Sequence, residues 1–129
     1  MERNLALETL HVTEAAAMAC ARMMGSGDEY LAYRKAREAM HWAFNSVKLN
    51  GTIVLGEGEE KECLELFRGE RIGTGEPPEV DIALDPLEGT TICATGGPNS
   101  ISVIAIGEKN SFMPCPDVYM EKIAVGPEA

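Results

Sequence analysis

The stretch Asp81-Ile82-Ala83-Leu84-Asp85-Pro86-Leu87-Glu88-Gly89-Thr90-Thr91 carries the most structural and chemical information in the sequence. Alternation of apolar and polar residues predicts a strand over residues 80–85 that ends at Asp85. Pro86 fixes φ, so we expect the chain to turn there. Residues 89–91 then open a short helix, whose free backbone N–H groups can receive a phosphate. The stretch therefore predicts a strand–turn–helix unit with carboxylates at the turn.

Two carboxylates in this unit can face one cation, because Glu88 lies about one turn beyond Asp85. Hard oxygen ligands without Cys or His favour Mg²⁺ or Mn²⁺ over zinc. Metal ions that bridge carboxylates and a phosphate would make a site for phosphoester hydrolysis. The same residues are equally compatible with a strand end, an Asx-type turn and a helix cap that bind nothing.

A second acidic turn, Gly56-Glu57-Gly58-Glu59-Glu60, follows the β-branched run at residues 52–55. Alone, such a turn is more typical of a solvated loop than of a set of ligands. Two acidic turns at the ends of two strands favour a shared cation.

Two helices are predicted before these strands, over residues 4–24 and 29–49. Gly25 and Gly27 end the first helix, and Asn50-Gly51 ends the second. Apolar residues at helical spacing predict the buried side of each helix. For the first helix these are Leu7, Leu10, Ala17, Cys20, Ala21 and Met24, and for the second Tyr33, Ala36, Met40, Phe44 and Val47. We expect the two helices to pack as a pair.

Further strands are predicted over residues 101–106 and 123–125. Residues 63–67 fit either a strand or a helical turn, and the Gly- and Pro-rich residues 69–78 predict a hairpin or loop. The expected architecture is α+β, with two N-terminal helices packed on a mainly antiparallel sheet. We expect one domain over residues 1–129, with Cys20 and Cys93 as small apolar core residues.

Charge and composition exclude several classes of partner. Eleven basic and 21 acidic residues give a net charge of −10, which disfavours nucleic acid and anionic membranes. No stretch reaches the ~20 apolar residues of a membrane-spanning helix, and residues 1–5 do not resemble a signal peptide. The four scattered cysteines predict reduced thiols rather than a zinc site. A cytoplasmic location is expected.

Several motifs spread along the chain point to one family. They are Val12-Thr13-Glu14, Gly51-Thr52-Ile53-Val54, Gly56-Glu57-Gly58-Glu59, Gly73-Thr74-Gly75, Asp85-Pro86-Leu87-Glu88-Gly89-Thr90 and Tyr119-Met120-Glu121-Lys122. On these residues the chain resembles the N-terminal part of class II fructose-1,6-bisphosphatases, the bacterial type that includes bifunctional fructose/sedoheptulose-bisphosphatases. That type is similar to the wider Mg²⁺-dependent, lithium-sensitive phosphatases.

The resemblance implies a reaction and a set of site residues. A metal-bound water would attack the 1-phosphate of fructose 1,6-bisphosphate, a step in gluconeogenesis. The implied metal ligands are Glu57, Asp85, Glu88 and the carbonyl of Leu87, for Mg²⁺ or Mn²⁺. The implied substrate contacts are Glu88, Gly89, Thr90 and Tyr119, and Thr90 would also orient the attacking water as the catalytic residue.

Two departures from the family pattern affect this machinery. Tyr33 stands where the resemblance implies a metal-binding Asp, and a neutral phenol is a poor ligand for Mg²⁺. Lys61 stands where it implies an acid that assists the catalytic water, and a cation cannot act as a general base at neutral pH. The chain also ends at Ala129, far short of a family member. We therefore expect weak or no catalysis from the isolated chain, and a role as a binding or regulatory subunit.

Two alternatives remain open. One is metal-dependent hydrolysis of the sugar bisphosphate, by an oligomer of this chain or by one half of a split enzyme. The other is a small domain with a new ligand site built on the phosphate turn. The expected partners are a sugar phosphate and either further copies of this chain or a partner phosphatase chain.

Overall fold

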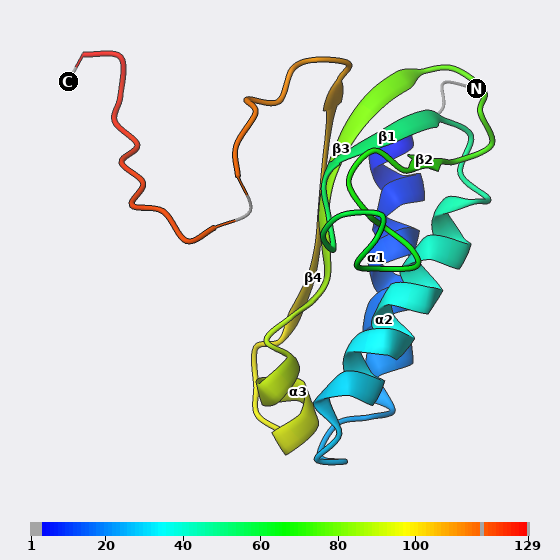
Figure 1. The fold of residues 1–129 in the computed structure, drawn as a ribbon, viewed down its shortest axis with the longest axis vertical. Helices are drawn as coiled ribbons and strands as arrows, with labels where there is room; N and C mark the ends of the chain where they lie inside the picture. The colour runs from blue at the N-terminus through cyan, green and yellow to red at the C-terminus, as the bar shows by residue number, and fades with distance from the viewer. Residues whose placement is uncertain (1–3, 117, 129) are drawn as a thin grey trace.

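The computed structural model describes residues 4–116 and 118–128, and it contains helices and one sheet (Figure 1). In chain order the elements are α1 (Leu5–Ala21), α2 (Glu29–Phe44), β1 (Asn50–Leu55), β2 (Arg71–Ile72), β3 (Glu79–Glu88), α3 (Thr90–Thr95) and β4 (Ile101–Glu108). Within the described ranges, none of the helices is both long enough and apolar enough to cross a membrane.

The sheet has the strand order β2-β1-β3-β4. β1 pairs antiparallel with β2, and β3 pairs antiparallel with β4. The central pair, β1 with β3, is parallel. The expected α+β class with a mainly antiparallel sheet is confirmed, and the parallel pair at its centre is a feature that the sequence did not indicate.

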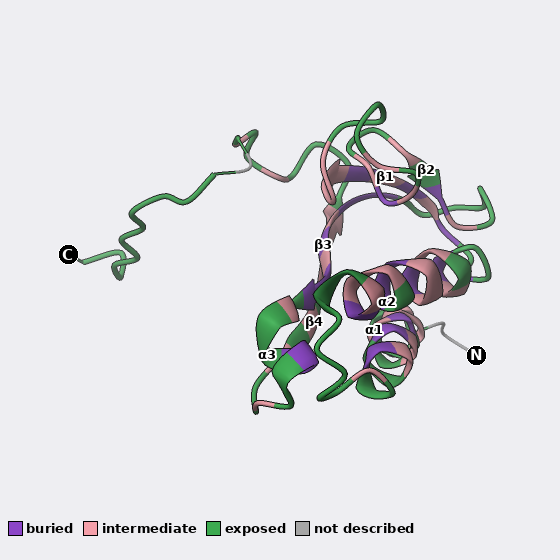
Figure 2. Cartoon of the chain, turned by 60° about the horizontal axis from the view of Figure 1, so that its bottom comes forward, coloured by how far each residue is buried: buried purple, intermediate pink, exposed green. Residues whose placement is uncertain are grey.

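Helices α1 and α2 lie side by side on one face of the sheet, as expected (Figures 1 and 2). The side chains of Asn4 and Asp28 cap their N-termini by accepting hydrogen bonds from Leu7 N and Leu31 N. The predicted buried side of the second helix is largely confirmed. Its buried members are Ala36, Met40, Phe44 and Val47, and Tyr33 is partly buried.

The second helix ends earlier than predicted, at Phe44 instead of residue 49. Residues 45–49 turn out of the helix and bring Val47 and Leu49, both buried, into the core ahead of β1. The sequence pattern placed the end too late because the apolar residues Val47 and Leu49 of this turn fit the spacing of buried residues in the helix.

The predicted buried side of the first helix is wrong except for Cys20, which is buried. Leu7, Leu10 and Met24 are 55%, 48% and 56% exposed, whereas Val12, Ala16 and Cys20 face the core. α1 is apolar on nearly all sides, so spacing alone could not select the face. The buried face carries Ala16, which belongs to the same core cluster as the fully buried Ala32 and Ala36 of α2.

Two strand predictions also need correction. β3 does not stop at Asp85 but runs through buried Pro86 to Glu88, with an irregular register between Asp85 and Glu88 that tolerates the missing N–H. Residues 123–125 are not a strand: they lie in an irregular C-terminal segment that leads away from the body (Figure 1). Residues 63–67 are irregular as well, and the 69–78 loop includes the short strand β2.

The sheet face opposite the helices stays partly open. Among the described residues, the segment 110–115 meets this face, and a cavity of about 430 Å³ lies between them, lined partly by Val54, Ala83 and Phe112. On β4, Ile101 and Val103 remain 53% and 41% exposed. Figure 2 colours buried stretches of both long helices purple.

Matched methionine substitutions test this assignment of the core. Met40→Ala removes a fully buried side chain and is expected to lower the free energy of unfolding by about 2–5 kcal/mol. Met18→Ala removes a side chain that is 66% exposed on α1 and is expected to change it by less than about 0.5 kcal/mol. Urea unfolding monitored by circular dichroism measures both, and similar losses for the two variants would contradict the orientation of α1.

Candidate functional site

The two acidic turns meet at one edge of the sheet, as the sequence predicted. Because β1 and β3 run parallel, the turn after β1 and the end of β3 lie at the same edge. Glu57 and Asp85 line a common shallow pocket of about 280 Å³, together with Leu55, Gly56 and Leu84. The parallel pairing therefore brings together two residues that are 28 positions apart.

The turn at the end of β3 is built around the Asp85 carboxylate. Its Oδ1 accepts a hydrogen bond from the backbone N–H of Leu87 at 2.9 Å, which is an Asx-type turn. Asp85 also shares a hydrogen bond with the side chain of Glu88. Leu87 is buried and Glu88 is exposed. The Asx-type turn that the sequence allowed is therefore present, and the shared cation stays a prediction.

A short helix follows this turn, as predicted. Gly89 takes the left-handed conformation with φ +86°, which favours glycine, and Thr90 is the first residue of α3. The Gly89 carbonyl accepts from the backbone N–H of Cys93 and from the Ser100 hydroxyl at 3.1 Å. The turn is therefore tied both to its own helix and to the start of β4.

The neighbouring carboxylates at this edge act on the pKa of Asp85. Burial, the hydrogen bond with Glu88 and the negative charges of Glu57 and Glu88 raise the pKa of Asp85 to about 6, although the Leu87 N–H opposes the rise. Like charges close together favour a cation or a proton between them.

Glu57, however, is also bound from the opposite side by α2. It shares a hydrogen bond with the Tyr33 hydroxyl, and the pKa of that phenol rises to about 12 through burial, this hydrogen bond and the glutamate charge. Tyr33 in turn interacts with Arg37, whose guanidinium lies 5.4 Å from the centre of the tyrosine ring. Glu57, which the resemblance implies to be a metal ligand, therefore interacts with Tyr33, and Tyr33 in turn lies beside the positive charge of Arg37.

The residues present do not make the metal-ligand set that the resemblance implies. Asp85 and Glu88 have suitable oxygen donors for a hard cation. Within the described ranges, though, no three carboxylate, imidazole or thiolate groups converge closely enough to hold a metal ion.

The structure does not bring every predicted residue to this edge. Glu57, Asp85, Leu87, Glu88, Gly89 and Thr90 lie in or beside the two turns. Tyr119 lies in the extended C-terminal segment, with its side chain fully exposed, in the part of the chain that Figure 1 draws away from the sheet. Residues of α2 were not predicted to act at the site beyond Tyr33, and the signal for Arg37 was only its spacing of four residues from Tyr33.

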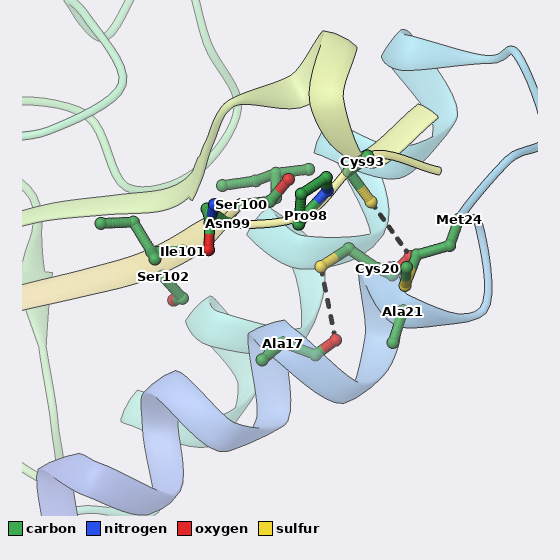
Figure 3. A pocket seen from close by; sticks show the side chains of 12 residues that line it. Ala17, Cys20, Ala21, Met24, Cys93, Pro98, Asn99, Ser100, Ile101 and Ser102 are labelled. Atoms are coloured by element: carbon green, nitrogen blue, oxygen red, sulfur yellow. Dashed lines mark hydrogen bonds between the residues drawn. The ribbon is translucent and has the colours of Figure 1, made fainter. Parts of the chain in front are cut away.

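A separate pocket of about 280 Å³ lies between α1, α3 and the start of β4 (Figure 3). Cys20 and Cys93 meet there, with the Cys93 thiol 3.6 Å from the Cys20 carbonyl oxygen. Burial, followed by the neighbouring Cys93, raises the pKa of Cys20 to about 11. Both thiols are buried, as predicted for core residues, and all four cysteines are unpaired. No motif in the sequence indicated this pocket.

Comparison with known proteins places the fold and the turns in a family. The model of the family described as "Bacterial fructose-1,6-bisphosphatase, glpX-encoded" matches residues 3–129. The chain belongs to this family. It is 48% identical over 129 residues to "Fructose-1,6-bisphosphatase 1 class 2" of Escherichia coli (strain K12), and 44% identical over 141 residues to "D-fructose 1,6-bisphosphatase class 2/sedoheptulose 1,7-bisphosphatase" of Synechococcus elongatus.

The match covers all of this chain but a minor part of each relative. It spans 38% of the Escherichia coli protein and 41% of the Synechococcus protein. The resemblance to class II fructose-1,6-bisphosphatases is thereby confirmed. The activity in the relatives' names belongs to proteins more than twice the length of this chain.

The raised pKa of Asp85 predicts a pH dependence of stability. A carboxyl that holds its proton more tightly when folded stabilises the folded state at low pH, and this contribution is lost as the pH rises through the folded pKa. The contribution of this group to the free energy of unfolding should therefore decrease as the pH rises from about 4 to about 6. Asp85→Asn should remove that slope, as measured by urea unfolding across this range.

The matched control is Glu60→Gln, a substitution at an exposed position in the other acidic turn. It should leave the slope as it is in the parent chain. A slope in Asp85→Asn as steep as in the parent would contradict the crowding of carboxylates around Asp85.

Proposed function

We propose that this 129-residue chain is catalytically weak or inactive by itself and acts as a binding or regulatory subunit within the class II fructose-1,6-bisphosphatase family. Its partner is a further copy of the chain or a phosphatase chain of this family, and its small ligand is a sugar phosphate. In this proposal it works in the cytoplasm, in the carbohydrate metabolism of gluconeogenesis.

One observation carries the proposal: Glu57 is engaged by Tyr33. Metal-assisted phosphate hydrolysis needs cations that are held firmly enough to position a water and neutralise developing charge. The neighbouring Glu88 helps to raise the pKa of Asp85 and so favours its protonated form, which binds a cation poorly. Lys61, exposed in the loop after Glu57, adds a positive charge where a base is required.

A binding role is supported by apolar surface that the described residues leave uncovered. One such surface is the outer stripe of α1, formed by Leu7, Leu10, Ala17, Ala21 and Met24, all of them exposed. A second is the open face of β4, with Ile101 and Val103. Contiguous exposed apolar residues of this kind are typical of interfaces.

The alternative function is metal-dependent hydrolysis of fructose 1,6-bisphosphate, by an oligomer or by one half of a split enzyme. It is favoured by the meeting of Glu57 and Asp85 in one pocket and by Thr90 at the start of α3. In this alternative a second chain supplies the substrate contacts that Tyr119, in its extended segment, does not make.

Phosphate release from fructose 1,6-bisphosphate separates the two functions. With Mg²⁺ or Mn²⁺, the isolated chain is expected to be at least roughly a thousandfold slower than the Escherichia coli relative, because several kcal/mol of transition-state stabilisation are missing. The Asp85→Ala variant should match the parent chain. Metal-dependent activity that disappears in Asp85→Ala would overturn the proposal and favour the alternative.

The split-enzyme form of the alternative has its own test. The part of the Escherichia coli relative that this chain does not match is produced as a separate polypeptide and mixed with the chain. Binding without phosphate release supports a binding subunit. Release that requires both polypeptides and Asp85 supports a split enzyme.

Self-association through the α1 stripe can be measured directly. Light scattering after size-exclusion chromatography should give a mass above that of one chain, and Leu10→Glu should lower it toward the monomer because it places a charge on the stripe. Leu64→Glu makes the same change at a leucine that is 84% exposed in the 56–70 loop, and it should leave the mass unaltered. A monomeric parent chain, or equal effects of both variants, would contradict this assignment.

A further inference from the structure

The sheet has two edges, and they differ in how well they are protected from pairing with a further strand. At one edge, β2 is only two residues long and carries the charged Arg71. At the other edge, β4 is eight residues long, and within the described residues its only strand neighbour is β3. Every second residue of such a strand directs its backbone N–H and C=O away from the sheet. These groups can pair with another strand.

The outer edge of β4 lacks the features by which proteins commonly prevent such pairing, which are charges, prolines and bulges. Residues 101–107 contain neither a charged residue nor a proline. From Val103 to Glu108 the ladder with β3 has a regular register, without a bulge. The chain has a net charge of −10, so its copies repel one another over much of their surface. An uncharged strand is a place where two copies can approach closely.

Alternate side chains of β4 decrease in size along the strand. They are Ile101, Val103, Ala105 and Gly107, and the first two are 53% and 41% exposed. Two such strands aligned antiparallel over residues 101–107 place Ile101 opposite Gly107. The same alignment places Val103 opposite Ala105. Each large side chain then meets a small one, and no charges oppose each other within the aligned residues. The strand is therefore complementary to a second copy of itself.

The start of β4 and the apolar α1 stripe border one groove. This groove is the pocket of Figure 3, and its described lining contains no charged side chain. The stripe contributes Ala17, Ala21 and Met24 to the lining, and β4 contributes Ile101 and Ser102. A second copy that pairs with β4 therefore also brings its own stripe toward this one.

We propose that two copies of this chain associate by antiparallel pairing of their β4 strands over residues 101–107, with their α1 stripes packed together beside the joined edges. The two four-stranded sheets then form one continuous sheet. The contact is two-fold symmetric, so it closes at a dimer. The inference rests on the proposed function, because it names the surface through which this binding subunit meets a further copy.

The first test is the dissociation constant of the dimer, measured by sedimentation over a range of concentrations. Val103→Lys places a positive charge from each copy at the joined edge and is expected to raise the constant at least roughly tenfold. The matched control is Val118→Lys, at a valine that is 58% exposed in the C-terminal segment. This control should keep the dissociation constant of the parent. Circular dichroism checks that both variants are folded.

Hydrogen exchange of the parent chain, resolved by residue with NMR, tests the pairing without any substitution. Dilution from well above to well below the dissociation constant should speed exchange at every second amide of residues 101–107, which are the amides that point outward. The amides that are bonded to β3 should stay protected at both concentrations. This measurement decides the proposal even where Val103→Lys does not fold.

Two results would show that the copies meet elsewhere and would overturn the proposal. One is equal dissociation constants for Val103→Lys and the parent. The other is exchange of the outward amides that does not change on dilution, as expected for association through the α1 stripe alone. A monomeric parent would overturn it as well, and a phosphatase chain would then remain as the partner in the proposed function. Phosphatase activity of the dimer would overturn the proposed function and leave this interface intact.

Discussion

The parallel pairing of β1 with β3 is the constraint on which the candidate site depends. It directs both strands to one edge of the sheet, so that the turns after them meet although the residues are distant in sequence. An antiparallel pairing would place Glu57 and Asp85 at opposite edges. The helices on one face fix the same arrangement, because the buried side chains of β1 and β3 both point into the core that α1 and α2 cover (Figure 2).

The local part of the site could be predicted from the sequence, and the reason is that it is built within a few residues. The Asp85 carboxylate folds back on Leu87 N–H, and Gly89 supplies the left-handed residue before α3. Each of these is a short-range preference of one residue type. The existence of β1, β3 and β4 was also predictable, since alternation with β-branched residues is a local signal.

What could not be predicted depends on contacts between distant segments. The exposed side of α1 was mistaken for its buried side because nearly every side of that helix is apolar, and the fit of Ala16 against α2 is a property of two helices together. Arg37 and His41 have regular spacing on α2, but the glutamates that they contact lie in an irregular loop without periodicity. Pairing Arg37 with Glu65 therefore required the structure.

The turn at residues 85–90 has a structural role whether or not it holds a cation. Pro86 and Leu87 are buried beside the core, the Asp85 carboxylate satisfies a backbone N–H, and the Gly89 carbonyl accepts from Ser100 at the start of β4. These contacts hold together the end of β3, the start of α3 and the residue before β4. Residues 85–90 therefore stabilise the fold with or without a cation. Glu57 has no such role in this turn, because its side chain interacts with Tyr33 of α2.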